Sequence, residues 1–89
     1  MAIEHKFKLS CNIAKSINPK ISKDELLLLY GLYKQSTVGP CKTAEPSKLN
    51  IKEHYKWAAW MANKDMDMND AKENYCVFVL KMVDKHGTI

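Results

Sequence analysis

Apolar residues recur along the chain at steps of three and four, which is the spacing of one face of an α-helix. The first such segment runs from about Ile3 to Ile17. Asn18 and Pro19 end it, because a residue that precedes proline is pushed out of the helical region. Its apolar face consists of Phe7, Ser10, Cys11, Ala14 and Ile17.

A second helix is predicted from about Lys23 to Val38. Ser22 followed by Glu25 has the spacing of a capping box, in which each side chain accepts a hydrogen bond from the other residue's backbone N–H. The segment after the cap is apolar nearly all round, so we expect it to be buried on two sides. Gly39 and Pro40 end it and open a long connection, Gly39 to Asn50. Loops of this length inside compact domains are uncommon and often functional.

Two further helices follow the connection. The third runs from about Ile51 to Asn63, with Asn50 as its expected cap and Glu53 at the reciprocal position. Its two faces carry, on one side, Tyr55, Ala58, Ala59 and Ala62, and on the other Trp57 and Trp60, of which Trp60 is assigned to the core. The fourth starts after Asp67 and runs to about His86, with Gly87 as C-cap. Its core stripe consists of Ala71, Tyr75, Phe78, Val79 and Met82.

These elements predict an all-α bundle with a long loop between its second and third helices. The 89 residues are enough for a single domain, residues 1–89. The longest apolar run, Leu26 to Tyr30, is far below the ~20 residues that span a bilayer. The start of the chain does not resemble a signal peptide, so we expect a cytoplasmic protein without stable membrane insertion.

The charge of the chain favours an anionic partner. All 14 basic residues are lysine, and the formal net charge is +4. Lysine is a compact point charge without the planar fork that reads guanine, so the composition fits phosphate binding better than base reading. The chain has no P-loop, no HExxH and no nucleophile elbow, and its Cys11, Cys41 and Cys76 are too scattered for a zinc site. We therefore expect free thiols, no catalytic residue, no metal and no cofactor.

One group of side chains suggests a specific ligand. Tyr30, Tyr33 and Lys34 are placed at helical spacing on one expected face, and two phenol rings beside an ammonium group suit an aromatic ring that bears phosphate. Lys52 and Lys56 are also four residues apart and repel each other slightly unless an anion lies near. From spacing alone, a tyrosine that packs in the core and lysines on a solvated face are the commoner interpretation.

The order of these motifs resembles the acyl-CoA-binding protein family, in its small free-standing form. The matching segments are LLLLYGLYKQSTVG, then EPSKLNIKEHYKWAAW, then NDAKENY, and together they extend from about Phe7 to Gly87. The resemblance implies a four-helix bundle of up-down-down-up order that binds medium- or long-chain acyl-CoA and carries it, without being an enzyme. Departures from the family pattern are Glu45 in place of a usual arginine and Ser47 in place of a glycine.

The resemblance also implies which residues meet the ligand. Tyr30 and Lys34 would contact the phosphorylated adenosine, Lys34 and Lys56 the 3′-phosphate, and Tyr33 the adenine. The full set expected at the CoA head group is Lys15, Tyr30, Gly31, Leu32, Tyr33, Lys34, Lys52, Lys56 and Tyr75. The set expected along the acyl chain, or in the core beneath it, is Phe7, Cys11, Leu26, Leu27 and Leu29.

The partners expected on this basis are fatty acyl-CoA and, transiently, acyl-CoA-using enzymes or membranes, with no nucleic acid, and the protein is expected to be a monomer. The alternative is a small basic helical module that binds protein or nucleic acid. A nucleic-acid-binding domain typically carries arginine and a clustered basic stripe, whereas the lysines of this chain are spread along it.

Overall fold

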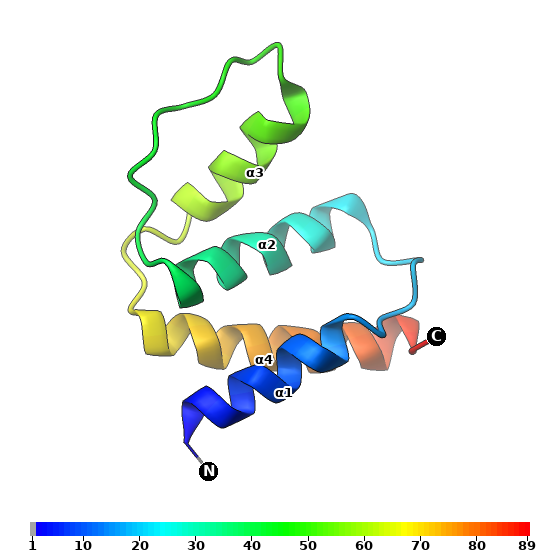
Figure 1. Ribbon diagram of the computed structural model, residues 1–89. Helices are drawn as coiled ribbons and strands as arrows, with labels where there is room; N and C mark the ends of the chain where they lie inside the picture. The colour runs from blue at the N-terminus through cyan, green and yellow to red at the C-terminus, as the bar shows by residue number, and fades with distance from the viewer. Residues whose placement is uncertain (1) are drawn as a thin grey trace.

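The computed structural model describes residues 2–89, and these residues form four α-helices (Figure 1). The helices are α1 (Ile3–Ala14), α2 (Lys23–Thr37), α3 (Ile51–Met61) and α4 (Met68–His86). The chain runs in one direction along α1 and α4 and in the opposite direction along α2 and α3 (Figure 1). The predicted all-α fold and its up-down-down-up order are confirmed.

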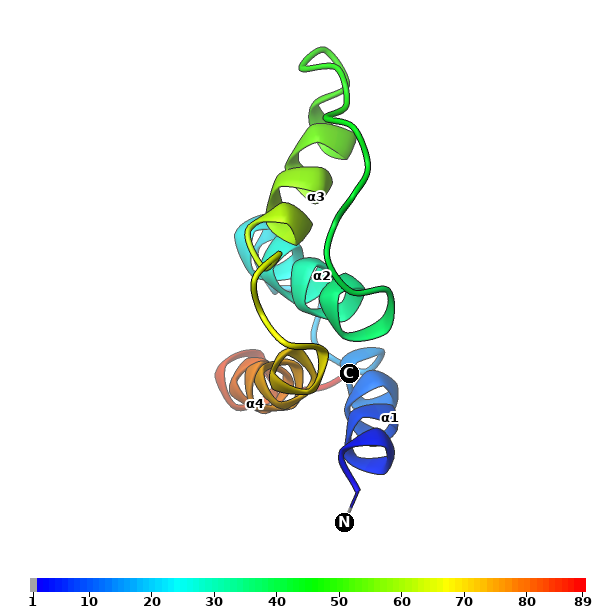
Figure 2. The ribbon, with the colours of Figure 1, turned by 90° about the vertical axis from the view of Figure 1, so that its left-hand side faces the viewer.

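Helix α2 lies in the middle of the molecule, with α4 on one side and α3 on the other. Helix α2 thus has neighbours on two sides, but the predicted burial of its apolar side chains is only partial, because Leu26 is 48% exposed and Leu28 56%. Helix α1 packs on α4, and Figure 2 shows these two helices side by side at the end of the molecule opposite α3. Among the described residues, α3 packs on no helix except α2, which leaves one wall of α2 and α3 open to solvent.

The core lies between α1, α2 and α4. Its buried cluster contains Phe7, Ile17, Tyr75, Cys76, Val79 and Met82. The predicted stripe of α4 is confirmed, except that Phe78 is only half-buried and that Cys76 belongs to the core as well. The three cysteines are free thiols, with Cys41 and Cys76 buried and Cys11 half-buried.

The end of α1 differs from the prediction, because the helix stops at Ala14 rather than Ile17. The reason is that the end of the chain supplies partners for the backbone of this turn. Asn18 donates its N–H to the Gly87 carbonyl at 2.9 Å, and Ile89 donates to the Ser16 carbonyl at 2.8 Å. Helices α2 and α3 also end one and two residues before the predicted Val38 and Asn63.

Three of the four predicted caps are confirmed. At the start of α2, Glu25 N–H donates to Ser22 Oγ at 3.1 Å, and Ser22 N–H donates to the Glu25 carboxylate at 2.9 Å. Asp67 accepts from Asn69 N–H at 3.0 Å at the start of α4, and Gly87 ends that helix with a φ of 77°.

The cap predicted at the start of α3 is wrong. The Asn50 side chain makes no capping hydrogen bond, because its backbone, with φ −91° and ψ 77°, is not in the extended conformation of the other N-caps. The Glu53 carboxylate lies 3.6 Å from the Lys56 ammonium instead of reaching back to the Asn50 N–H.

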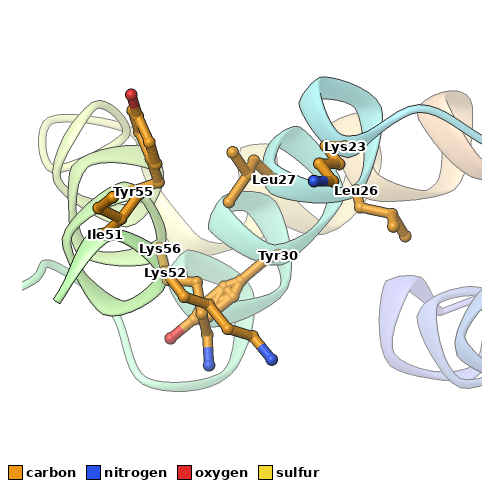
Figure 3. A pocket seen from close by; sticks show the side chains of 8 residues that line it. All are labelled: Lys23, Leu26, Leu27, Tyr30, Ile51, Lys52, Tyr55 and Lys56. Carbon is orange, nitrogen blue, oxygen red and sulfur yellow. The ribbon is translucent and has the colours of Figure 1, made fainter.

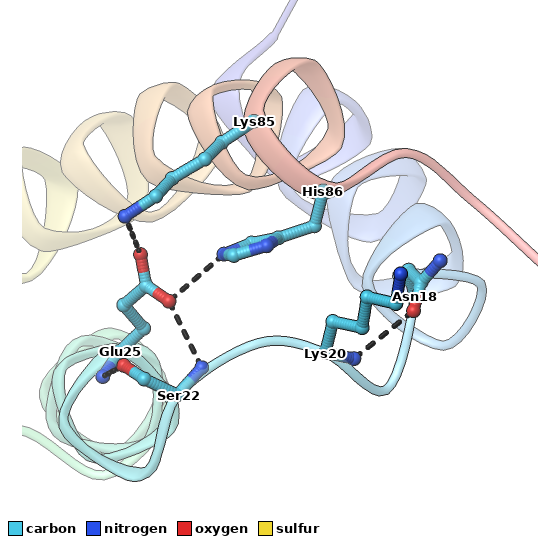
Figure 4. A network of polar contacts seen from close by, with 6 residues as sticks. All are labelled: Asn18, Lys20, Ser22, Glu25, Lys85 and His86. Atoms are coloured by element: carbon cyan, nitrogen blue, oxygen red, sulfur yellow. Dashed lines mark hydrogen bonds and ion pairs between the residues drawn. The ribbon is translucent and has the colours of Figure 1, made fainter.

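A polar network joins the start of α2 to the end of α4 (Figure 4). The Glu25 carboxylate, already bonded to Ser22, lies 2.8 Å from Lys85 Nζ and 2.9 Å from His86 Nε2. The Lys85 ammonium is the main reason that the pKa of Glu25 falls from 4.5 to about 2, and the bonds from Ser22 and His86 add to this effect. Glu25 therefore serves both as a helix cap and as a link between the two helices.

Candidate ligand-binding site

A groove of about 690 Å³ lies between α2 and α3 (Figure 3). Its volume is in the range of small-molecule sites, and its walls are mostly apolar with a few convergent polar groups. The lining residues are Lys23, Leu26, Leu27, Tyr30, Ile51, Lys52, Tyr55 and Lys56.

The close contact between α2 and α3 beside the groove depends on a glycine. Gly31 is buried, and a Cβ atom added there would lie only 2.8 Å from the carbonyl carbon of Ala59. The missing side chain of Gly31 therefore lets the α3 backbone approach α2 closely. Gly31 belongs to this crossing and does not line the groove.

Two of the three lysines that line the groove, Lys52 and Lys56, lie on one side of it, whereas Lys23 lies beside Leu26 (Figure 3). Figure 3 shows the Lys52 and Lys56 side chains extending from α3 toward the Tyr30 ring of α2. The Lys56 ammonium lies 4.9 Å from the centre of that ring, which is cation–π distance. Ile51 and Tyr55 lie together on another part of α3, so the groove has an apolar region and a cationic region (Figure 3).

A smaller pocket of about 200 Å³ continues from the cationic region and shares Tyr30 and Lys56 with the groove. It adds Lys34, whose ammonium lies 4.8 Å from the centre of the Trp60 ring. The structure thus brings together Tyr30, Lys34 and Lys56, three of the residues expected at a phosphorylated adenosine. Its other lining residues are Thr43, Pro46, Glu53, Trp57 and Trp60.

The long loop that closes this pocket is held by one face of α3. Trp60 donates its indole N–H to the Gly39 carbonyl at 2.8 Å, and Trp57 donates to the Thr43 carbonyl at 3.0 Å. His54 Nε2 lies 2.7 Å from the Glu45 carboxylate. The three α3 residues are spaced three apart, so they follow one another along the helix surface and fix successive points of the loop. The Glu45 that replaces the usual arginine of the family has this local partner.

Tyr33 does not share the face of Tyr30 and Lys34, so this part of the sequence prediction is wrong. Tyr33 lies on the side of α2 that packs on α4, with its ring centre 6.1 Å from those of both Phe7 of α1 and Tyr75 of α4. The Phe7 and Tyr75 rings are 5.1 Å apart. Viewed along a helix axis, a residue three positions after Tyr30 is rotated to one side of it and a residue four positions after it is rotated to the other side. Tyr33 and Lys34 therefore contact different neighbouring helices.

Burial changes the pKa of two groups at this aromatic cluster, the Tyr75 hydroxyl and the Cys11 thiol. Burial is the main cause that raises the pKa of the Tyr75 hydroxyl, and the neighbouring Cys11 thiol adds to it. Burial also raises the pKa of Cys11, against smaller opposing effects of Tyr75 and Lys15. The protonated thiol is a poor nucleophile, so the cluster offers shape and apolar surface rather than reactive groups.

The remaining predicted residues lie elsewhere. Leu29 and Leu32 are half-buried and pack against the core cluster rather than lining the groove. Lys15 is exposed at the C-terminal end of α1. Of the predicted head-group and acyl-chain residues, those that line the two pockets are Leu26, Leu27, Tyr30, Lys34, Lys52 and Lys56.

Sequence reasoning did not assign eight lining residues to the site, and it assigned one of them, Trp60, to the core. They are Lys23, Thr43, Pro46, Ile51, Glu53, Tyr55, Trp57 and Trp60. A usable signal existed for two of them. Ile51 and Tyr55 are four residues apart at the start of α3, which is the spacing of an apolar pair on one helix face.

Residues 2–89 show neither a metal site nor a membrane-spanning helix. No group of three or more His, Cys, Asp and Glu side chains in this range is arranged to hold a metal ion. No helix in the same range combines the length and the apolar character needed to cross a membrane.

Comparison with known proteins identifies the family. The family model described as "Acyl CoA binding protein" matches residues 4–79. The chain is 35% identical over 88 residues to "Acyl-CoA-binding protein" of Gossypium hirsutum, with 99% of each chain covered. It is 42% identical over 78 residues to "Acyl-CoA-binding protein 2" of Saccharomyces pastorianus, covering 84% of this chain and 90% of the relative.

Solved structures agree. The crystal structure of Oryza sativa Acyl-CoA-Binding Protein 2 superposes with a TM-score of 0.91 at 37% identity, covering 93% of this chain and 90% of the other. The solution structure of acyl CoA binding protein from Babesia bovis gives a TM-score of 0.77 at 31% identity, with 96% and 97% covered. The chain belongs to the acyl-CoA-binding protein family.

Proposed function

We propose that this protein binds medium- or long-chain acyl-CoA thioesters with high affinity and acts as a cytoplasmic carrier that maintains an acyl-CoA pool. The observation that carries the proposal is the groove between α2 and α3. It offers apolar walls in one region and Tyr30 with lysine ammonium groups in another. An acyl-CoA has the same division into an apolar tail and an anionic, aromatic head.

The head group is assigned to the cationic region and the smaller pocket. Lys34 and Lys56 would hold the 3′-phosphate through charge-assisted hydrogen bonds, with Tyr30 beside them and Lys52 as a further cation. The aromatic cluster of Phe7, Tyr33 and Tyr75 is proposed as a further contact surface for the ligand, with Lys15 at its edge.

The acyl chain is assigned to apolar surface, including Leu26 and Leu27. Each methylene removed from water contributes roughly 0.8 kcal/mol. Covering even half of a palmitoyl chain would therefore contribute several kcal/mol beyond the head-group contacts. This addition is the physical reason why the intact thioester should bind more tightly than either of its halves.

We propose carriage rather than catalysis, and the protonation of two groups supports this. The Cys11 thiol and the Tyr75 hydroxyl are protonated at neutral pH because their pKa values are raised. Neither is activated to attack a thioester. We infer that the protein is a monomer that passes its ligand, transiently, to acyl-CoA-using enzymes or to membranes.

The test is calorimetry or tryptophan fluorescence with palmitoyl-CoA, free CoA, free palmitate and a DNA oligonucleotide. Trp57 and Trp60 both line the smaller pocket, so ligand entry should change their emission. The proposal requires that palmitoyl-CoA bind far more tightly than the other three. Equal affinity for palmitate alone would contradict it, and tighter binding of DNA would favour a nucleic-acid-binding module.

A further inference from the structure

The tip of the molecule formed by the end of the long loop and the start of α3 exposes apolar side chains. Leu49 is 94% exposed, Ile51 63% and Tyr55 57%. These residues are close in sequence, and Figure 1 shows that their segment lies at the end of the molecule furthest from α1 and α4. We call Lys48, Leu49, Ile51, Lys52 and Tyr55 the α3 tip. A leucine so fully exposed contributes nothing to the packing of the fold.

The charge around this apolar surface is positive. Among residues 2–89, Lys42, Lys48 and Lys52 have no carboxylate within ion-pair distance. The two acidic residues of the same region are already paired, Glu45 with His54 and Glu53 with Lys56. The α3 tip therefore presents unpaired ammonium groups beside exposed leucine, isoleucine and tyrosine.

We propose that the α3 tip docks on the surface of an anionic phospholipid bilayer. Apolar side chains at the end of a helix can enter the boundary between head groups and acyl chains, and neighbouring lysines attract anionic lipids. Tyrosine, with an apolar ring and a polar hydroxyl, suits the same boundary. The amount of attraction from a few lysines is modest, so the docking is reversible.

The shape of the tip favours a bilayer over a protein partner. A stable protein interface buries roughly 800 Å² on each partner, which needs a broad complementary face. The α3 tip is instead the end of a loop and the start of one helix, at one extremity of the fold, and its apolar surface consists of three side chains, Leu49, Ile51 and Tyr55. A fluid lipid surface needs no complementary shape to accept it.

The position of the tip connects docking with transfer of the ligand, and this connection rests on the proposed function. Ile51, Lys52 and Tyr55 belong both to the tip and to the wall of the groove between α2 and α3 (Figure 3). When the tip lies on a bilayer, this wall of the groove faces the lipid. An acyl chain can then pass between groove and bilayer over a short path with little exposure to water.

The experiment measures flotation of the full chain with vesicles of phosphatidylcholine and phosphatidylserine, and with vesicles of phosphatidylcholine alone. Leu49→Asp is the test variant because Leu49 lines neither pocket and its removal leaves the core intact. Leu80→Asp is the matched control, because Leu80 is a 59% exposed leucine of α4, which does not pack on α3. Lys48→Gln tests the charge alone.

We expect the wild type and Leu80→Asp to float with anionic vesicles and to be released by salt. Leu49→Asp should bind about tenfold more weakly, and Lys48→Gln about fivefold. Equal binding of Leu49→Asp and wild type, equal binding to neutral vesicles, or a concentration-dependent dimer that Leu49→Asp abolishes would each overturn the proposal.

Binding of palmitoyl-CoA is measured separately by titration. A wild type that binds palmitoyl-CoA but does not float counts against docking, whereas a wild type that floats but does not bind palmitoyl-CoA counts against the proposed carrier function.

Discussion

At the scale of single residues, the site is defined by where lysine ammonium groups meet aromatic rings. Lys34 stands over Trp60 at 4.8 Å and Lys56 over Tyr30 at 4.9 Å, on opposite helices but around one pocket. Two cations held near each other without an anion repel, and Glu53 offsets this for Lys56 alone, at 3.6 Å. A phosphate group bound in this pocket, as we propose, would offset the charge of both lysines.

Replacing Lys34 by alanine should weaken palmitoyl-CoA binding by roughly 10- to 100-fold, because a hydrogen bond to a charged group contributes about 1.5–3 kcal/mol. The measurement is calorimetric titration, with thermal unfolding as the check that the domain stays folded. Lys81→Ala is the control, since Lys81 is exposed on α4 and lines neither pocket. If the two variants bind equally well, Lys34 is not a ligand-binding residue.

At the scale of elements, the sequence predicted where the helices lie better than it predicted which helices pack against one another. The Ser22–Glu25 box and Asp67 are local signals that depend on a few residues, and the structure has both caps. The division of Tyr30 and Tyr33 between two sides of α2 depends on which helices flank it, and spacing alone does not contain that information. The end of α1 was missed for a similar reason, because its backbone partners are Gly87 and Ile89, some seventy residues away.

The crossing of α2 and α3 makes a prediction about Gly31. Alanine normally stabilises a helix interior relative to glycine by up to ~1 kcal/mol. At Gly31 the added Cβ would meet the Ala59 backbone, so we expect Gly31→Ala to destabilise the protein by about 1–3 kcal/mol. Because α2 and α3 together form the groove, displacement of α3 in this variant should also weaken its binding of palmitoyl-CoA.

Urea unfolding measures the first effect and calorimetry the second. Leu28→Ala provides the comparison within the same helix, because Leu28 is 56% exposed and its truncation should cost little. A Gly31→Ala protein that is more stable than the wild type would show that the two backbones are not in close contact.

At the scale of the whole molecule, stability depends on links between segments that are distant in sequence. Lys6 pairs with Glu73 at 3.0 Å and Lys72 pairs with Glu4, so two ion pairs join α1 to α4. Each pair has at least one well-exposed carboxylate, Glu73 at 52% and Glu4 at 63%, and such pairs contribute little. The Glu25 network is different, because the Glu25 and His86 side chains are largely shielded and the same carboxylate also caps α2 (Figure 4).

Glu25 should therefore govern part of the acid sensitivity of the fold. Its pKa is about 2 in the folded protein against an ordinary 4.5, so the unfolded chain takes up a proton at higher pH than the folded one. The stabilisation is fully present above pH 4.5 and is lost as the pH falls from 4.5 toward 2. In Glu25→Gln this contribution is absent at every pH.

We expect that variant to unfold at a lower temperature than wild type near neutrality, with the difference shrinking as the pH approaches about 2. Asp24→Asn, an exposed neighbour in the same helical turn, should instead keep the pH dependence of the wild type. Parallel curves for Glu25→Gln and wild type across this range would mean that the link between α2 and α4 does not stabilise the fold.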